Sequence, residues 1–138
     1  MISVTPGSKY VTIGGMISNN VIGKNSKNNQ FRYILKKIEL LNSNKEIITC
    51  SNNSNKRLFD TTIGGFGLTG IILSAVIKLK KINSQIIDQN IFKFNNFLEF
   101  EKIVKKKTKF NVSWIDSHSL NKKKLKGLFY SGDFSKKK

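Results

Sequence analysis

Two glycine-rich stretches decide how this sequence is interpreted: Pro6-Gly7-Ser8 leading into Thr12-Ile13-Gly14-Gly15, and Thr62-Ile63-Gly64-Gly65-Phe66-Gly67-Leu68-Thr69-Gly70-Ile71-Ile72. We call them the first and the second signature. Because glycine has no Cβ and accepts positive φ, such runs bring several backbone N–H groups close to one ligand. An anion, or a flat heteroaromatic ring with carbonyl edges, suits a surface of this kind.

The spacing excludes two common glycine-rich nucleotide motifs. The chain has no G-x-x-x-x-G-K-[ST] motif, and it has no G-x-G-x-x-G motif that opens a helix. The stretch 65–70 has the second spacing, but the residues that follow are β-branched and alternate, which predicts a strand over 70–81. Neither a P-loop nor a dinucleotide fingerprint is therefore expected.

Several segments, in chain order, resemble the FAD-linked oxidases of the vanillyl-alcohol-oxidase type. They are residues 4–8, 11–17, 23–25 and 62–72, and the likeness continues through 112–116 and, more weakly, through 127–133. Such oxidases are several times longer than 138 residues. The resemblance implies an α+β fold, mainly antiparallel sheet flanked by helices and truncated at both ends. Residues 1–94 are expected to form the second FAD-binding subdomain, and 95–138 the start of the substrate (cap) domain.

The resemblance also implies which residues bind the cofactor and the substrate. Its FAD-contacting positions fall on Gly7, Thr12, Ile13, Gly14, Gly15, Asn19, Asn20, Val21, Ile22, Gly65, Gly70 and Ile71, and its substrate-contacting positions fall on Gly23, Lys24 and Trp114. The closest members carry a histidine where this chain has Ile22. Since isoleucine cannot anchor a flavin covalently, non-covalent FAD is expected. No catalytic residue and no metal site is identified.

The implied activity is oxidation of a secondary alcohol of a sugar or polyprenyl-phosphate sugar, with hydride transfer to the flavin. A short-chain reductase is the implied protein partner. The expected location is cytoplasmic, at the membrane periphery where the substrate is lipid-linked. A fragment or split gene product is the favoured interpretation, and a complete small protein is the alternative. A remnant that binds FAD or docks on a partner without turnover is the second functional hypothesis.

A basic nucleic-acid-binding domain is the third hypothesis, and it rests on composition. The formal net charge is +17, with 25 Lys and Arg against 8 Asp and Glu. However, 57 of the 138 residues are Asn, Ile or Lys, which indicates a general bias that uncharged and apolar residues share. Lysine runs such as 105–107, 122–124 and 136–138 are usually solvated. Nucleic-acid binding is therefore not expected, and no apolar run is long enough to span a membrane.

Periodicity and turn residues predict mixed structure. We expect a strand over 10–13, a helix over 16–20, a hairpin over 33–50, a helix over 54–61 and strands over 70–81, 86–94 and 110–115. On the strand over 70–81 the core side is expected to carry Ile71, Leu73, Ala75, Ile77 and Leu79. Asn96 and Glu99 resemble a capping box for a helix to residue 107 that buries Phe97, Phe100 and Val104. Cys50 is expected to be half-buried in a strand, and His118 to lie on a surface loop.

Overall fold

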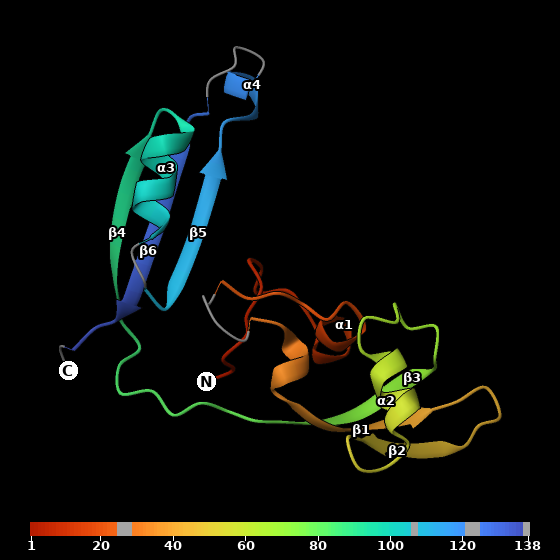
Figure 1. Ribbon diagram of the computed structural model, residues 1–138. Coiled ribbons are helices and arrows are strands. Elements are labelled where there is room, and N and C mark those ends of the chain that lie inside the picture. The colour runs from red at the N-terminus through yellow and green to blue at the C-terminus, as the bar shows by residue number, and fades with distance from the viewer. Residues whose placement is uncertain (25–28, 106–107, 121–124, 137–138) are drawn as a thin grey trace. The chain divides into compact units, whose positions relative to one another are not determined.

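The computed structural model describes residues 1–24, 29–105, 108–120 and 125–136. These residues form two compact units (Figure 1). The first unit contains residues 1–23 and continues to Lys81, and the second contains Lys24 and the residues from Ile82 onward. The mixed α+β class, with antiparallel sheets flanked by helices, is confirmed.

The first unit is built around one three-stranded antiparallel sheet in the order β2-β1-β3. Its elements are α1 (Ile13–Ser18), the 3-10 helix η1 (Phe31–Tyr33), β1 (Leu35–Leu41), β2 (Ile47–Ser51), α2 (Lys56–Thr62) and β3 (Ile71–Ile77). The expected hairpin is confirmed. At its turn, Asn42 Oδ1 accepts hydrogen bonds from the backbone N–H groups of Asn44 and Glu46, each at 2.9 Å, which fixes the connection between β1 and β2.

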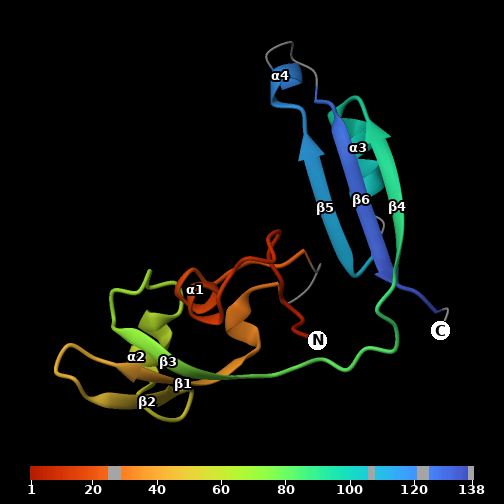
Figure 2. The same ribbon diagram turned by 180° about the vertical axis from the view of Figure 1, so that it is seen from behind.

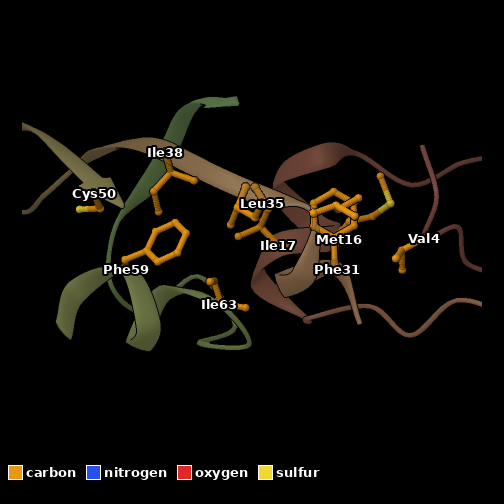
Figure 3. Close-up of a cluster of buried hydrophobic side chains, with 10 residues drawn as sticks. Val4, Met16, Ile17, Phe31, Leu35, Ile38, Cys50, Phe59 and Ile63 are labelled. Atoms are coloured by element: carbon orange, nitrogen blue, oxygen red, sulfur yellow. The ribbon is translucent and has the colours of Figure 1, made fainter. Parts of the chain in front are cut away.

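Side chains from the helices and from β1 and β2 form the core of the first unit (Figure 3). Ile17 of α1, Phe31 of η1, Ile38 of β1 and Phe59 of α2 are almost completely buried. Cys50 of β2 is also fully buried rather than half-buried, because it faces this core. The core therefore connects α1, which begins within the first signature, with α2, which ends where the second signature begins.

The strand expected over 70–81 ends at Ile77, so Leu79 lies beyond it and is exposed. Within β3 the expected core side is wrong at Ile71 and Leu73, which are also exposed. The pairing of β3 with β1 shifts register between Glu39 and Leu40, so that Glu39 is opposite Ser74 but Leu40 is opposite Ile72. A shift of one residue moves the following side chains to the other face of a sheet. The core side therefore carries Ile72, Ala75 and Ile77.

The start of α1 also differs from the expectation. The sequence predicts a strand over 10–13 and a helix from residue 16, whereas α1 begins at Ile13. Thr12 is its N-cap: it has extended backbone and its hydroxyl accepts a hydrogen bond from the Gly15 N–H at 3.0 Å. Because an N-cap threonine satisfies a free N–H group of the first turn, the helix can begin at the next residue. Gly14 and Gly15 consequently lie inside the helix.

The second unit is a three-stranded antiparallel sheet with one helix packed on it. Its elements are β4 (Ile87–Phe94), α3 (Phe97–Val104), β5 (Phe110–Ile115), α4 (Ser117–Leu120) and β6 (Gly127–Phe134), and β6 is the central strand in the order β4-β6-β5. The N-cap is confirmed: Asn96 Oδ1 accepts a hydrogen bond from the Glu99 N–H at 2.9 Å. The reciprocal bond differs from a capping box, because the Glu99 carboxylate accepts from the N–H of Asn95, the residue before the cap, at 2.7 Å.

Helix α3 buries less than the sequence predicts, and it ends at Val104 instead of reaching residue 107. Its Phe100 packs on Phe94 and Phe129 of the sheet, with ring centroids 4.9 and 6.5 Å apart. Phe97 and Val104 are exposed, because a helix packed on one side of a single sheet buries only the stripe that faces the strands.

The two units meet along the chain near residue 81, whereas the sequence places a boundary after Phe94. The strand Ile87–Phe94 pairs along its whole length with β6, and it therefore belongs to the second unit. The assignment of these regions to an FAD-binding and a substrate domain remains a prediction. None of the helices in the described parts of the chain has the length and apolar character needed to cross a membrane.

Candidate functional site

The amino-terminal turn of α1 leaves backbone open at the first signature. Gly15 N–H and Met16 N–H donate to the side chain and the carbonyl of Thr12. The N–H groups of Ile13 and Gly14 have no partner among the described residues. A Cβ built on Gly14 would meet no atom within 4 Å. At Gly14 the backbone of this signature therefore borders free space.

Gly15 differs from its neighbour. A Cβ at this position would lie 3.1 Å from Thr12 Oγ1, the atom that caps the helix. The sequence places Gly15 among the FAD-contacting positions, but in the structure a side chain added there first meets the capping hydroxyl. The backbone next to open space is therefore tested more cleanly at Gly14 than at Gly15.

The carboxyl end of α1 is tied to η1 by the next group of expected FAD residues. Asn19 Nδ2 donates to the Gly15 carbonyl at 2.9 Å, and Asn20 Oδ1 accepts from the Arg32 N–H at 3.1 Å. Val21 accepts a backbone hydrogen bond from Phe31 at 2.9 Å. Asn19, Asn20 and Val21 thus have clear structural roles. A role in binding FAD stays a prediction for them.

The structure joins the two signatures directly. Gly64 N–H donates to the Ile17 carbonyl at 3.0 Å, and Phe66 N–H donates to the Ser18 carbonyl at 2.9 Å. Gly64 has φ +78°, a conformation that glycine adopts without strain. The hydroxyls of Thr62 and Thr69 lie 2.9 Å apart across the base of the same loop. The second signature is therefore a loop that hydrogen bonds hold against the carboxyl end of α1.

Two glycines of the second signature are explained by contacts within the protein. A Cβ on Gly65 would lie 2.2 Å from the Thr61 carbonyl oxygen, and one on Gly70 would lie 2.4 Å from the Leu41 carbonyl oxygen. Real Cβ atoms do not approach that closely, so both positions require glycine for the local packing of the backbone. Their requirement for glycine is accounted for without a cofactor.

The remaining expected FAD residues lie at the surface of the first unit. Gly7 is exposed in an irregular segment, and Ile22 and Ile71 are apolar side chains that are more than half exposed. Ile22 lies beside Gln30 in an isolated antiparallel bridge. Ile22 and Ile71 are therefore accessible to a ligand.

The division between the two units falls between Gly23 and Lys24, the two neighbouring residues that are expected at the substrate. Gly23 is buried in the first unit and its N–H donates to the Asn29 carbonyl at 2.6 Å. Lys24 belongs to the second unit, where its carbonyl accepts a hydrogen bond from the Asn111 N–H of β5 at 2.8 Å. Lys24 and the third expected substrate residue, Trp114, therefore lie in the same unit.

Trp114 lies on the face of the second sheet that α3 does not cover. Paired residues of antiparallel strands share a face, so the register groups Trp114 with Leu128 and Lys93, and Val112 with Tyr130 and Ile91. Helix α3 covers the other face, which holds Phe94 and Phe129. Figure 2 shows the sheet from the side without this helix. We call that side the open face; its strand residues are Ile87, Gln89, Ile91, Lys93, Phe110, Val112, Trp114, Leu128, Tyr130, Gly132 and Phe134.

A hollow of about 160 Å³ lies on the open face. Lys24, Gln89, Phe110 and Tyr130 line it, and it extends over Gly132, which has no side chain to fill it. Sequence reasoning found Lys24 but missed the other three side chains. The alternation of residues 128, 130 and 132 was the available signal, because it places them on one face of a strand.

An ion-pair cluster lies on α2 of the first unit. Asp60 contacts Lys56, one helical turn away, and Arg32 of the segment η1. Hydrogen bonds from Lys56 and Arg32 lower the pKa of the Asp60 carboxyl. Both cations stabilise the ionised form, so this cluster fastens α2 to η1 and does not have the character of a catalytic acid.

Cys50 and His118 take no part in either candidate site. Burial raises the pKa of the Cys50 thiol, which disfavours the nucleophilic thiolate. His118 lies exposed in the short helix α4, not in a loop as expected. Among the described residues no group of His, Cys, Asp and Glu is arranged to hold a metal ion.

Comparison with known proteins gives partial matches. No family model matches the chain. Decaprenylphosphoryl-beta-D-ribose oxidase of Mycolicibacterium smegmatis is 39% identical over 80 residues, which are 56% of this chain and 17% of that protein. Cytokinin dehydrogenase 3 of Oryza sativa subsp. japonica is 32% identical over 94 residues, covering 67% of this chain and 18% of that protein. Cytokinin dehydrogenase 3 of Arabidopsis thaliana is 37% identical over 76 residues, covering 51% and 14%.

The chain thus spans about a sixth of the length of these relatives. Their names include an oxidase and dehydrogenases that act on different substrates. The matches support the resemblance of this sequence to the FAD-linked oxidases without selecting one member of that group: the chain is similar to short segments of longer oxidoreductases.

Proposed function

We propose that the chain is part of an FAD-dependent oxidoreductase, and that the docked pair of signatures in the first unit contributes to its flavin site. The observation that carries the proposal is the backbone at Gly14. Its N–H and that of Ile13 have no partner among the described residues, and no atom lies where a Cβ would stand. Similarity to an oxidase and to dehydrogenases supports a redox role for this geometry.

The residues of this chain offer a flavin hydrogen-bond donors and an apolar side chain. The two free N–H groups can donate to an anion or to a carbonyl edge, and Ile22 supplies an exposed apolar side chain. Bound FAD would supply the hydride acceptor; the chain would supply binding and orientation. Ile22 offers no nucleophile, so the flavin would be held non-covalently at this position.

The substrate is proposed to be a sugar or a polyprenyl-phosphate sugar, oxidised at a secondary alcohol. Lys24 and Trp114 are the residues proposed to contact it, and both lie in the second unit. Binding of FAD without turnover is the second candidate. Both candidates bind flavin, but only the oxidoreductase converts a substrate.

The test uses the 138-residue chain co-expressed with the segments that complete the oxidase, and measures flavin released on denaturation. In this assembly Gly14→Ala is expected to lower retained FAD roughly tenfold, which corresponds to a loss of about 1.4 kcal/mol of binding. In the same variant the fold should gain about 1 kcal/mol, because alanine is the better helix former at a site with free space. Asn44→Ala is the control, since Asn44 is exposed in the turn between β1 and β2 and lies outside both signatures.

Stoichiometric FAD in Gly14→Ala would contradict the proposal. Substrate-dependent dye reduction by the assembly, absent from the 138-residue chain alone, would distinguish the oxidoreductase from the remnant. Circular dichroism of each variant separates a loss of flavin from a loss of fold.

A further inference from the structure

The two edges of the sheet in the first unit differ. The outer edge of β2 is closed by the segment that follows this strand. Ser51 N–H donates to the Ser54 carbonyl at 2.7 Å, and Asn55 Nδ2 donates to the Thr49 carbonyl at 2.8 Å. On β3, in contrast, β1 is the only strand partner among the described residues. The sheet therefore has a closed edge at β2 and an open edge at β3.

Backbone N–H groups of β3 point out of the sheet at the open edge. The neighbouring Lys78 N–H donates to the Ile34 carbonyl at 2.7 Å, on the side of β1. Because successive N–H groups of a strand point to opposite edges, those of Ala75 and Ile77 point away from β1. Neither has a hydrogen-bond partner among the described residues. Unpaired groups of this kind are a template for pairing with a further strand.

The side chains of β3 do not block such pairing. Proteins protect open strand edges with charged side chains, above all lysine, or with proline. Residues 61–77 contain no charged residue and no proline, although the whole chain has 25 Lys and Arg. Leu73 and Val76 of β3 are exposed apolar side chains. A strand paired at this edge would satisfy the backbone and also cover part of these side chains.

We propose that β3 pairs with β3 of a second copy of the chain, in antiparallel direction about a two-fold axis. A two-fold interface uses the same surface on both partners, and each copy here supplies the uncharged strand that the other lacks. The direction is favoured by charge, because Lys78, Lys80 and Lys81 directly follow β3. These lysines would be neighbours in a parallel pair, whereas an antiparallel pair places them at opposite ends.

The first test is the oligomeric state of the 138-residue chain, measured by sedimentation velocity over a wide range of concentration. A dimer is expected to form as the concentration rises. Each copy carries a formal charge of +17, so added salt should strengthen the dimer by screening the repulsion between the copies. In nuclear magnetic resonance spectra, the amide shifts of Ala75 and Ile77 should change with concentration in step with dimer formation. The pairing requires no flavin, so this proposal and the proposed function fail separately.

Matched variants locate the interface. Leu73→Lys should raise the dissociation constant of the dimer about tenfold, because the two-fold axis brings a new charge from each copy to the same edge. Leu73→Thr introduces no charge and should retain the dimer. Ile47→Lys is the control, since Ile47 is an equally exposed apolar residue on β2, at the closed edge. Circular dichroism verifies the fold of each variant.

Three results would overturn the proposal. A monomer at every concentration would leave the edge to a strand from a different partner. Equal weakening by Leu73→Lys and Ile47→Lys would show an effect of net charge alone. A dimer in which the amide shifts of Ala75 and Ile77 do not change would place the interface elsewhere on the chain.

Discussion

At the scale of single residues, Asp60 is the group whose ionisation is most clearly coupled to folding. Lys56 and Arg32 both donate to its carboxylate, and they lower its pKa in the folded chain. A carboxyl whose folded pKa is lowered stabilises the fold above its unfolded pKa, and this contribution is lost as the pH falls through the folded value. The cluster therefore protects the first unit at neutral pH and loses this effect in acid.

We predict that Asp60→Asn lowers the urea midpoint at pH 7 and flattens the loss of stability below about pH 4, where an ordinary aspartate becomes protonated. The measurement is urea unfolding followed by circular dichroism between pH 2 and 7. Asp88→Asn is the control, because it makes the same change of charge at a carboxylate without an ion pair among the described residues. Parallel pH profiles for the parent chain and Asp60→Asn would contradict the assignment.

The sequence could predict the two signatures but not the duties of their separate glycines. Gly14, Gly65 and Gly70 look alike in a motif, and all three were expected to face FAD. In the structure Gly14 borders open space. Gly65 and Gly70 must be glycine because a Cβ would collide with a carbonyl oxygen, that of Thr61 earlier in the chain and that of Leu41 on β1, respectively. Such distances depend on the folded backbone, so a local pattern does not reveal them.

At the scale of elements, Gly70 controls how closely β3 approaches β1. Its φ is +140°, and the carbonyl of Leu41 occupies the space where a side chain would begin. We predict that Gly70→Ala destabilises the first unit by about 1 to 3 kcal/mol, because the strands must move apart.

The matched control for Gly70→Ala is Gly67→Ala, measured by the same urea unfolding. Gly67 also has positive φ, +80°, but no atom lies within 4 Å of its added Cβ. It should lose only about 1 kcal/mol, the cost of left-handed backbone for alanine. If both variants lose equally, conformation alone explains Gly70, and the steric reading is wrong.

The cap of α3 offers a second test at this scale. Asn96→Ala removes the side-chain oxygen that accepts from Glu99 N–H, and it should destabilise the second unit by about 1 kcal/mol. Asn95→Ala leaves the backbone N–H that donates to Glu99 in place and is expected to be nearly neutral. Trp114 fluorescence during urea unfolding follows this unit. A neutral Asn96→Ala would show that packing of Phe100 suffices to hold the helix.

Features whose sequence signals lie within a few residues could be predicted, whereas features that depend on the pairing of distant strands could not. The hairpin turn at Asn42 and the Asn96–Glu99 cap each lie within a few residues, and both are confirmed. The register shift opposite β3 depends on β1, more than thirty residues earlier, so alternation alone placed Leu73 on the wrong side. Strand β6 became recognisable as a central strand only through its two partners.

At the scale of the whole molecule, the formal charge of +17 is the dominant property. Because lysines are spread over both units, we predict weak DNA binding without sequence preference. Its affinity should fall steeply with salt, as expected for counterion release. Fluorescence anisotropy with two unrelated DNA duplexes, at salt concentrations between about 50 and 200 mM, measures this affinity and its salt dependence. Binding that persists at the higher salt and prefers one duplex would favour a nucleic-acid function.

Two backbone hydrogen bonds, from Gly64 to Ile17 and from Phe66 to Ser18, connect segments that are far apart in the sequence. Hydrogen exchange at these two amides therefore reports whether the second signature is docked on α1, and the measurement requires no activity. The amides can exchange only when the loop opens, and their protection factors give the free energy of that opening. A ligand that spans both signatures should slow the exchange of the two amides together, while one bound only near Gly14 would leave them unchanged.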